Sequence, residues 1–116
     1  MTRSEFSAWC SSVRLLDGAT GSMLRTAGMP VGVCSESWIL SHPQPLLELQ
    51  RAYLAAGSDV VYAPTFGANR VLLSHHDLQK DVAALNRDLV QLSREAVGTG
   101  ALLAGDMTTT GQPVTP

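Results

Sequence analysis

Two short apolar runs, residues 60–63 and 101–104, constrain the fold more than any other feature of the chain. They read VVYA and ALLA, so neighbouring positions are apolar and both faces of an extended segment would be hydrophobic. Strands of this kind occur in parallel sheets that are covered on both faces. A third run, VRLL at residues 13–16, ends at Asp17-Gly18 and predicts a buried strand with its exit turn.

Between these runs, residues 41–57 and 77–98 have the spacing of amphipathic helices. Apolar residues recur on one face of each segment: Leu46, Leu49, Tyr53 and Ala56 in the first, and Leu78, Val82, Leu85, Leu89, Leu92 and Ala96 in the second. The predicted N-caps are Ser41, with Gln44 as its reciprocal partner, and Asp77. The glycines predicted to end the two helices are Gly57 and Gly98.

Shorter helices are predicted around Phe6 and Trp9, within residues 19–28 and within residues 68–76. Residues 29–40 show no helical or strand periodicity of apolar residues, which predicts a loop. The order is strand, helix, strand, helix, strand. That order predicts right-handed βαβ units, and therefore an α/β fold with a parallel sheet and helices outside it.

Polar and small residues follow each predicted strand. Asp17-Gly18 follows the first strand, Thr65-Phe66-Gly67 the second and Gly105-Asp106 the third. Because the carboxyl ends of parallel strands form the ligand-binding edge of α/β proteins, we expect a small-molecule site there. Pro64 costs little stability because the hydrogen-bond ladder of the strand ends there. Gly67 lets the backbone approach a ligand closely, and Thr65 offers a hydroxyl group to it.

Each of these residues has a purely structural alternative. Asp17 before a glycine is equally consistent with a turn, and Asp106 with a cap on the following loop. Phe66 fits a core position, and Glu36 in the predicted loop is ambiguous. The adjacent pair His75-His76 indicates a solvated helix boundary, because neighbouring side chains point in different directions and make a poor metal pair.

Composition excludes several classes of function. The net charge is −2 and aromatic residues make up 5%, which argues against a nucleic-acid-binding surface. No apolar run approaches the roughly 20 residues that span a bilayer, and the N-terminus lacks the apolar segment of a secretory signal. The two cysteines, Cys10 and Cys34, lack metal-site spacing, so free thiols in a cytoplasmic protein are expected.

Four stretches together resemble a known family. LLDGATGSML, ESWILSHP, RAYLAAGSDVVYAPTFGANR and AGDMTTTG occur in the order of the N-terminal part of the homocysteine S-methyltransferase domain, as in cobalamin-dependent methionine synthase. The resemblance implies a (β/α)8 barrel and methyl transfer to the sulfur of homocysteine, giving methionine. Ala63-Pro64 and residues 108–111 depart from the commoner T-N-T-F-G and G-P-T-G patterns of the family.

The resemblance also implies roles for individual residues. Asp17 would contact the amino group of homocysteine, with the Gly18 and Ala19 backbone nearby. Thr65, Phe66 and Gly67 would lie beside the amino-acid end of the substrate. A carboxylate opposite an ammonium, and backbone N–H groups opposite a carboxylate, are the contacts that such a ligand requires.

The family's zinc, held by cysteine thiolates, keeps the substrate sulfur deprotonated. Its ligands come from later strands, so neither Cys10 nor Cys34 is expected to bind it. We therefore expect this chain alone to bind no catalytic zinc and to turn over nothing. By the same resemblance, cobalamin or methyltetrahydrofolate would act through other domains.

The chain is also short for the implied barrel, which needs about 250 residues. Residues 1–116 therefore predict a partial domain of about three β/α units, expected to self-associate or to pair with the missing barrel portion. Two alternatives remain at this point. One is a non-catalytic part-barrel module that assembles with another subunit, and the other is a small α/β domain that binds an unrelated amino acid.

Overall fold

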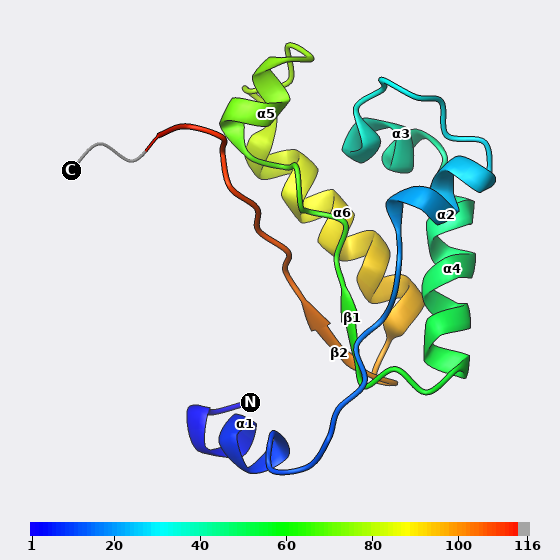
Figure 1. Cartoon of the computed structure of the whole chain (residues 1–116), viewed down its shortest axis with the longest axis vertical. Coiled ribbons are helices and arrows are strands. Elements are labelled where there is room, and N and C mark those ends of the chain that lie inside the picture. The colour runs from blue at the N-terminus through cyan, green and yellow to red at the C-terminus, as the bar shows by residue number, and fades with distance from the viewer. Residues whose placement is uncertain (114–116) are drawn as a thin grey trace.

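Three parallel segments lie side by side in the computed structural model, which describes residues 1–113 (Figure 1). β1 (Val60–Tyr62) and β2 (Leu102–Ala104) pair in parallel. On the other edge of β1, Leu16 forms an isolated parallel bridge to Val60. The predicted parallel α/β arrangement is thus confirmed, but the predicted first strand is reduced to one bridge.

The first segment is hydrogen-bonded to β1 along one side only. The Leu15 carbonyl accepts the N–H groups of Asp59 (2.8 Å) and Val60 (3.2 Å), and the Asp17 N–H donates to the Val60 carbonyl (3.0 Å). On the outer side, within the part of the chain that the structure describes, no strand pairs with this segment. Leu15 and Leu16 consequently remain 56% and 53% exposed.

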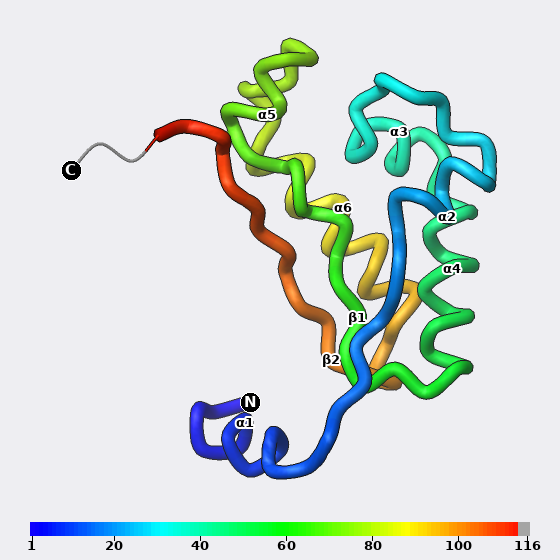
Figure 2. Tube along the Cα trace, in the orientation of Figure 1, coloured from blue at the N-terminus to red at the C-terminus, as the bar shows by residue number. Residues whose placement is uncertain are grey.

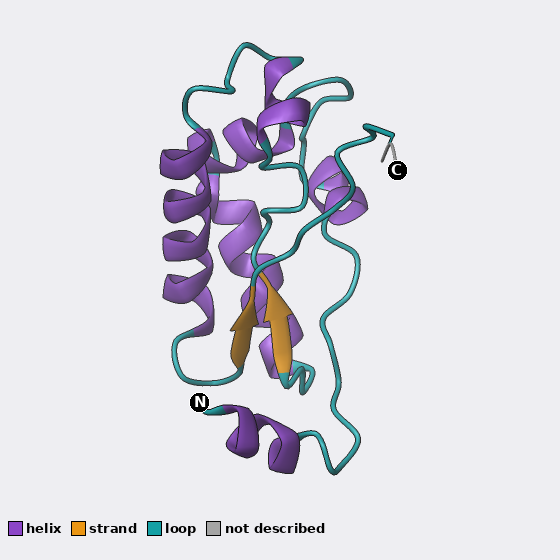
Figure 3. Cartoon of the chain, turned by 90° about the vertical axis from the view of Figure 1, so that its left-hand side faces the viewer, coloured by secondary structure: helices purple, strands orange, loops and turns teal. Residues whose placement is uncertain are grey.

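Helices flank these segments. In chain order they are α1 (Arg3–Trp9), α2 (Gly21–Thr26), α3 (Ser35–Ser41), α4 (Pro43–Ala55), α5 (Arg70–Ser74) and α6 (Val82–Val97). The two longest, α4 and α6, pack against each other and cover one face of the sheet (Figure 3). Leu47, Val61 and Val97 form a buried cluster there. No described helix is long and apolar enough to cross a bilayer.

α3 occupies residues that the sequence predicts to be a loop. Its residue Ile39 is 2% exposed and belongs to a buried cluster with Leu24 of α2, Leu46 of α4 and Leu89 of α6. Burial of this kind stabilises a helix that has no recognisable period, because tertiary packing outweighs local propensity. α3 thereby becomes a wall beside the carboxyl end of β1.

The helix ends partly differ from the predicted caps. Ser41 is the last residue of α3, where its hydroxyl donates to a carbonyl one turn earlier (3.1 Å), so the predicted capping pair on α4 does not form. Asp77 has a left-handed backbone (φ 59°) in the turn after α5, and α6 begins only at Val82. Gly57 and Gly98 end α4 and α6 with φ of 102° and 55°, as predicted.

The predicted helix faces are largely confirmed, with one polar addition. Leu46 of α4 and Leu85, Leu89 and Ala96 of α6 are buried, whereas Ala56 is exposed. Gln50 is also buried, and its Nε2 donates to the Tyr62 carbonyl (3.0 Å) and to Ser93 Oγ (3.1 Å). This amide therefore links α4 and α6 to the end of β1.

The other face of the sheet is open. Leu16, Tyr62 and Leu102 line a cavity of about 550 Å³ on this face, and its opposite wall is formed by Phe6 and Trp9 of α1. The path of the chain shows α1 below the amino ends of the three segments (Figure 2). The covered and open faces of the sheet thus differ, and β2 is only partly buried along its length.

Arg14 attaches α1 to the sheet. Its guanidinium lies 4.4 Å from the centre of the Trp9 ring, and its Nε donates to the Trp9 carbonyl (2.9 Å). A second contact joins Arg14 Nη1 to Asp59 Oδ1 at 3.7 Å, just before β1. Arg14 therefore links the end of α1 to the residue that precedes β1.

Candidate functional site

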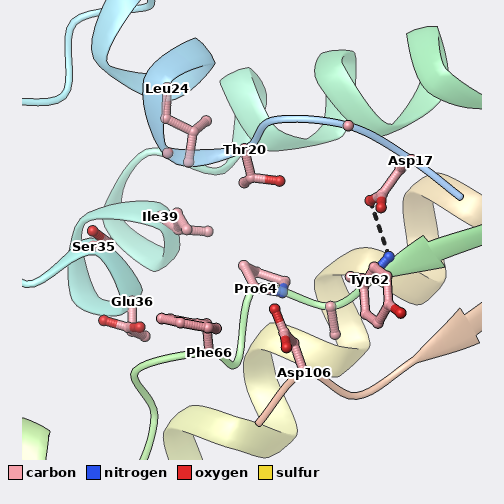
Figure 4. A pocket seen from close by; sticks show the side chains of 13 residues that line it. Asp17, Thr20, Leu24, Ser35, Glu36, Ile39, Tyr62, Pro64, Phe66 and Asp106 are labelled. Carbon is pink, nitrogen blue, oxygen red and sulfur yellow. Dashed lines mark hydrogen bonds between the residues drawn. The ribbon is translucent and has the colours of Figure 1, made fainter. Parts of the chain in front are cut away.

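A cavity of about 330 Å³ lies at the carboxyl ends of the parallel segments (Figure 4). Its walls come from the three segment ends, from the start of α2 and from α3. The lining residues are Asp17, Gly18, Thr20, Gly21, Leu24, Ser35, Glu36, Ile39, Tyr62, Ala63, Pro64, Phe66 and Asp106. The predicted gathering of polar tips at one edge is therefore present, and α2 and α3 turn that edge into a concave site.

Asp17 lies at the end of the first parallel segment, where it is hydrogen-bonded to β1. Its Oδ2 accepts the Tyr62 N–H at 3.0 Å, which fixes the carboxylate in the cavity wall. Burial raises the pKa of Asp17 above its usual value, and the nearby Asp106 carboxylate raises the pKa further, whereas the Tyr62 N–H acts in the opposite direction. Burial thus works against the ionised form of Asp17, and a cation beside the carboxylate would work in its favour.

Gly18 and Ala19 differ in their relation to the cavity. Gly18 lines it, and a Cβ built there would lie 2.9 Å from Tyr53 Oη. The Ala19 carbonyl accepts a hydrogen bond from the same Tyr53 hydroxyl at 2.7 Å. Tyr53 of α4 therefore fixes this turn, and only glycine fits beneath its ring without a shift.

Thr65 connects the ends of β1 and β2. Its hydroxyl donates to the Asp106 carbonyl (2.9 Å) and accepts the Asp106 N–H (3.0 Å), and the residue is 7% exposed. The hydroxyl hydrogen of Thr65 is already donated to Asp106. Thr65 therefore holds the two strand ends together and has no hydroxyl hydrogen left for a ligand. Phe66, by contrast, is 56% exposed and lines the cavity, which excludes the alternative that it is a core residue of this chain.

Gly67 is engaged by a residue whose role the sequence leaves ambiguous. Its N–H donates to Glu36 Oε1 at 3.0 Å, although the two residues are 31 positions apart. Glu36 Oε2 accepts a hydrogen bond from the Cys34 thiol at 3.4 Å. Burial raises the pKa of the Cys34 thiol, and the neighbouring Glu36 carboxylate adds to that effect. The sequence carries no signal for this contact because α3 itself is not predicted.

The cavity is acidic. Three carboxyl side chains, from Asp17, Glu36 and Asp106, line it, and none of its lining residues is Lys, Arg or His. Figure 4 shows the Asp106 and Asp17 side chains on the same side of the cavity as Tyr62. Such a charge pattern suits an ammonium group better than a carboxylate, because opposite charges attract strongly where water is partly excluded.

The described residues do not fit the thiolate-held zinc that the resemblance implies for the whole domain. Among residues 1–113, no group of three or more His, Cys, Asp or Glu side chains could hold a metal ion. Cys10 is exposed beside the α1 cavity, whereas Cys34 immediately precedes α3. The pair His75-His76 is exposed in the turn after α5.

Comparisons with known proteins show the family and the fold of the chain. The family model for homocysteine S-methyltransferase matches residues 14–116. The homocysteine methyltransferase MmuM from Escherichia coli is similar in its metallated form (TM-score 0.69, 22% identity, 85% of this chain) and in its oxidized form (TM-score 0.75, 19% identity, 91% of this chain). The chain spans 39% and 41%, respectively, of these solved structures. By the family match over most of its length, the chain belongs to the homocysteine S-methyltransferase family.

Proposed function

We propose that the chain forms part of a homocysteine-binding domain that transfers a methyl group to the sulfur of homocysteine, giving methionine. The observation that carries this proposal is the position of Asp17 in the wall of a cavity at the carboxyl ends of parallel segments. Ligands bind at this edge in α/β proteins. Family membership supports the reaction class.

In the proposed complex, Asp17 holds the ammonium group of homocysteine. The Tyr62 N–H keeps its carboxylate in place, and Asp106 adds negative charge from the end of β2. Phe66 supplies an exposed apolar surface for the aliphatic part of the ligand. During the reaction the S–CH3 bond forms as the bond from the methyl group to its donor breaks; the donor keeps the electron pair of that bond, and the thiol proton passes to water.

The remaining machinery is proposed to lie outside this chain. We propose about three β/α units of a (β/α)8 barrel here, with the zinc ligands on later strands and any cobalamin or methyltetrahydrofolate site on other domains. A fold likeness that spans about two fifths of the solved chains supports this division. The chain alone is predicted to be inactive, and a cytoplasmic location remains a prediction.

Titration calorimetry tests the binding step directly. Homocysteine, kept reduced, is expected to bind the chain, and Asp17→Asn is expected to weaken binding about tenfold or more because a charge-assisted hydrogen bond is lost. Asp88→Asn, an exposed substitution on α6 with the same change in charge, serves as the control. Absence of homocysteine binding, or equal effects of the two substitutions, would overturn the proposal.

A second candidate is a non-catalytic module that assembles with another subunit. The open sheet face favours it, because Leu16 is 53% exposed and lies beside the apolar cavity under α1. Co-purification of the chain with a polypeptide that carries later strands and a cysteine cluster separates the candidates. Methyl transfer by the reconstituted pair supports the enzyme, whereas stable assembly without activity in the presence of zinc supports the module.

A further inference from the structure

Glu36 makes a contact that changes what the cavity can recognise. It projects from the first turn of α3 to the turn after β1, where Oε1 accepts the Gly67 N–H at 3.0 Å. A Cβ built at Gly67 would lie 2.6 Å from the same oxygen, so a side chain there would displace the Glu36 carboxylate. The second oxygen, Oε2, accepts the Cys34 thiol hydrogen. Both oxygens of Glu36 are therefore held.

This contact removes a donor from the site. A backbone amide carries one hydrogen, so the Gly67 N–H cannot bind a ligand carboxylate while Glu36 accepts it. The substrate-carboxylate contact that the family resemblance implies for this turn is thus closed in this arrangement. An anion approaching Gly67 would also meet the Glu36 charge at close range, which is unfavourable.

We propose that Glu36 is a specificity-determining residue that makes this cavity select the ammonium end of an amino-acid ligand. It does so in two ways, by occupying the Gly67 N–H and by adding a third negative charge to those of Asp17 and Asp106. The inference rests on the proposed function. The ligand's carboxylate then points away from Gly67, toward the open side of the site.

Three related thiols test the selection. Homocysteine carries both charged groups, 3-aminopropanethiol lacks the carboxylate, and 4-mercaptobutanoate lacks the ammonium. Dissociation constants for all three are measured calorimetrically on the full chain under reducing conditions. We expect 3-aminopropanethiol to bind more tightly than 4-mercaptobutanoate, because every charged side chain in the cavity wall is acidic.

Two substitutions separate the two effects of Glu36. Glu36→Gln keeps an oxygen that can accept the Gly67 N–H but removes the charge, so affinity for 3-aminopropanethiol should fall about two- to fivefold. Glu36→Ala also frees the N–H, so 4-mercaptobutanoate should bind more tightly to it than to Glu36→Gln. Glu48→Gln, on the exposed side of α4, makes the same charge change and should leave all three constants unchanged.

The outcomes test the role of Glu36 separately from the proposed homocysteine-binding function. If homocysteine binds but the ratio of amine to carboxylate affinity is the same in Glu36→Ala as in the original chain, Glu36 has only a structural role and the inference fails. Circular dichroism confirms that each variant is folded before this comparison is made. If homocysteine does not bind the original chain, the proposed function fails, and the inference fails with it.

Discussion

The Thr65 hydroxyl and the Asp106 backbone are joined by two hydrogen bonds, one in each direction, at 2.9 and 3.0 Å. The pair joins the chain after β1 to the chain after β2 at the edge of the cavity, which Asp106 lines. Thr65 is 7% exposed, so water cannot readily replace these bonds. The acidic wall contributed by Asp106 therefore depends on a residue from the neighbouring strand.

Replacing Thr65 by valine tests this link. Thr65→Val keeps the shape of the side chain but leaves the half-buried N–H and carbonyl of Asp106 without their partner, so the free energy of unfolding should fall by about 1–2 kcal/mol. Urea denaturation followed by circular dichroism measures the change. Thr99→Val, in an exposed turn, is the matched control, and equal effects of the two substitutions would show that the link is dispensable.

Gly18 is expected to tolerate no side chain. In Gly18→Ala the new methyl group would meet Tyr53 Oη at 2.9 Å and Cε1 at 3.0 Å, so the ring must shift and lose its bond to the Ala19 carbonyl. Overpacking of this kind costs about 1–3 kcal/mol of the free energy of unfolding. Gly21→Ala, where a Cβ meets nothing within 4 Å, should not destabilise the chain, as thermal unfolding of both variants would show.

Stability should depend on pH through Asp17. Burial raises the pKa of Asp17 in the folded chain above its usual value of 3.8. The neutral form is therefore favoured by folding, and its contribution is complete below pH 3.8 and lost as pH rises through the raised folded pKa. Between those values the original chain should lose stability relative to Asp17→Asn.

Urea denaturation of both proteins across this pH range isolates the effect, because the other carboxyl groups titrate in both. A stability difference that changes in the opposite direction would mean that the Tyr62 N–H, which lowers the pKa of Asp17, outweighs burial.

Removing the Arg14 side chain should release α1. Arg14→Ala loses the contact with the Trp9 ring at 4.4 Å and the ion pair with Asp59. In a Trp38→Phe background, the fluorescence of Trp9 should then shift to longer wavelength, because the indole becomes more hydrated. Arg25→Ala, an exposed substitution on α2, should leave the emission unchanged. An unchanged spectrum in Arg14→Ala would mean that other contacts hold the helix.

The sequence predicts the parallel segments and the long helices because each has its own pattern. Adjacent apolar residues mark β1 and β2, and the helical spacing marks α4 and α6. The site's position follows from the same patterns, since carboxyl ends of parallel segments meet at one edge. Of the residues predicted for the site, Asp17, Gly18 and Phe66 line the cavity, whereas Ala19, Thr65 and Gly67 are not among its lining residues.

The parts of the fold and of the cavity that the sequence does not predict depend on contacts between residues far apart in the chain. α3 forms because Ile39 packs against Leu24 and Leu89, and no local period records that burial. Ser41 fits an N-cap of α4 only if residues 29–40 form a loop, whereas in the structure it is the last residue of α3. Glu36 reaches Gly67 across 31 positions, so its part in the cavity is a product of the fold.

The placement of α1 has a practical consequence. The helix α1, which the exposed Cys10 directly follows, lies below the amino ends of the strands, whereas the acidic cavity lies at their carboxyl ends (Figure 1). A biosensor surface can therefore capture the chain through its N-terminus, or a dye can be attached to the Cys10 thiol, while the cavity stays facing the solution.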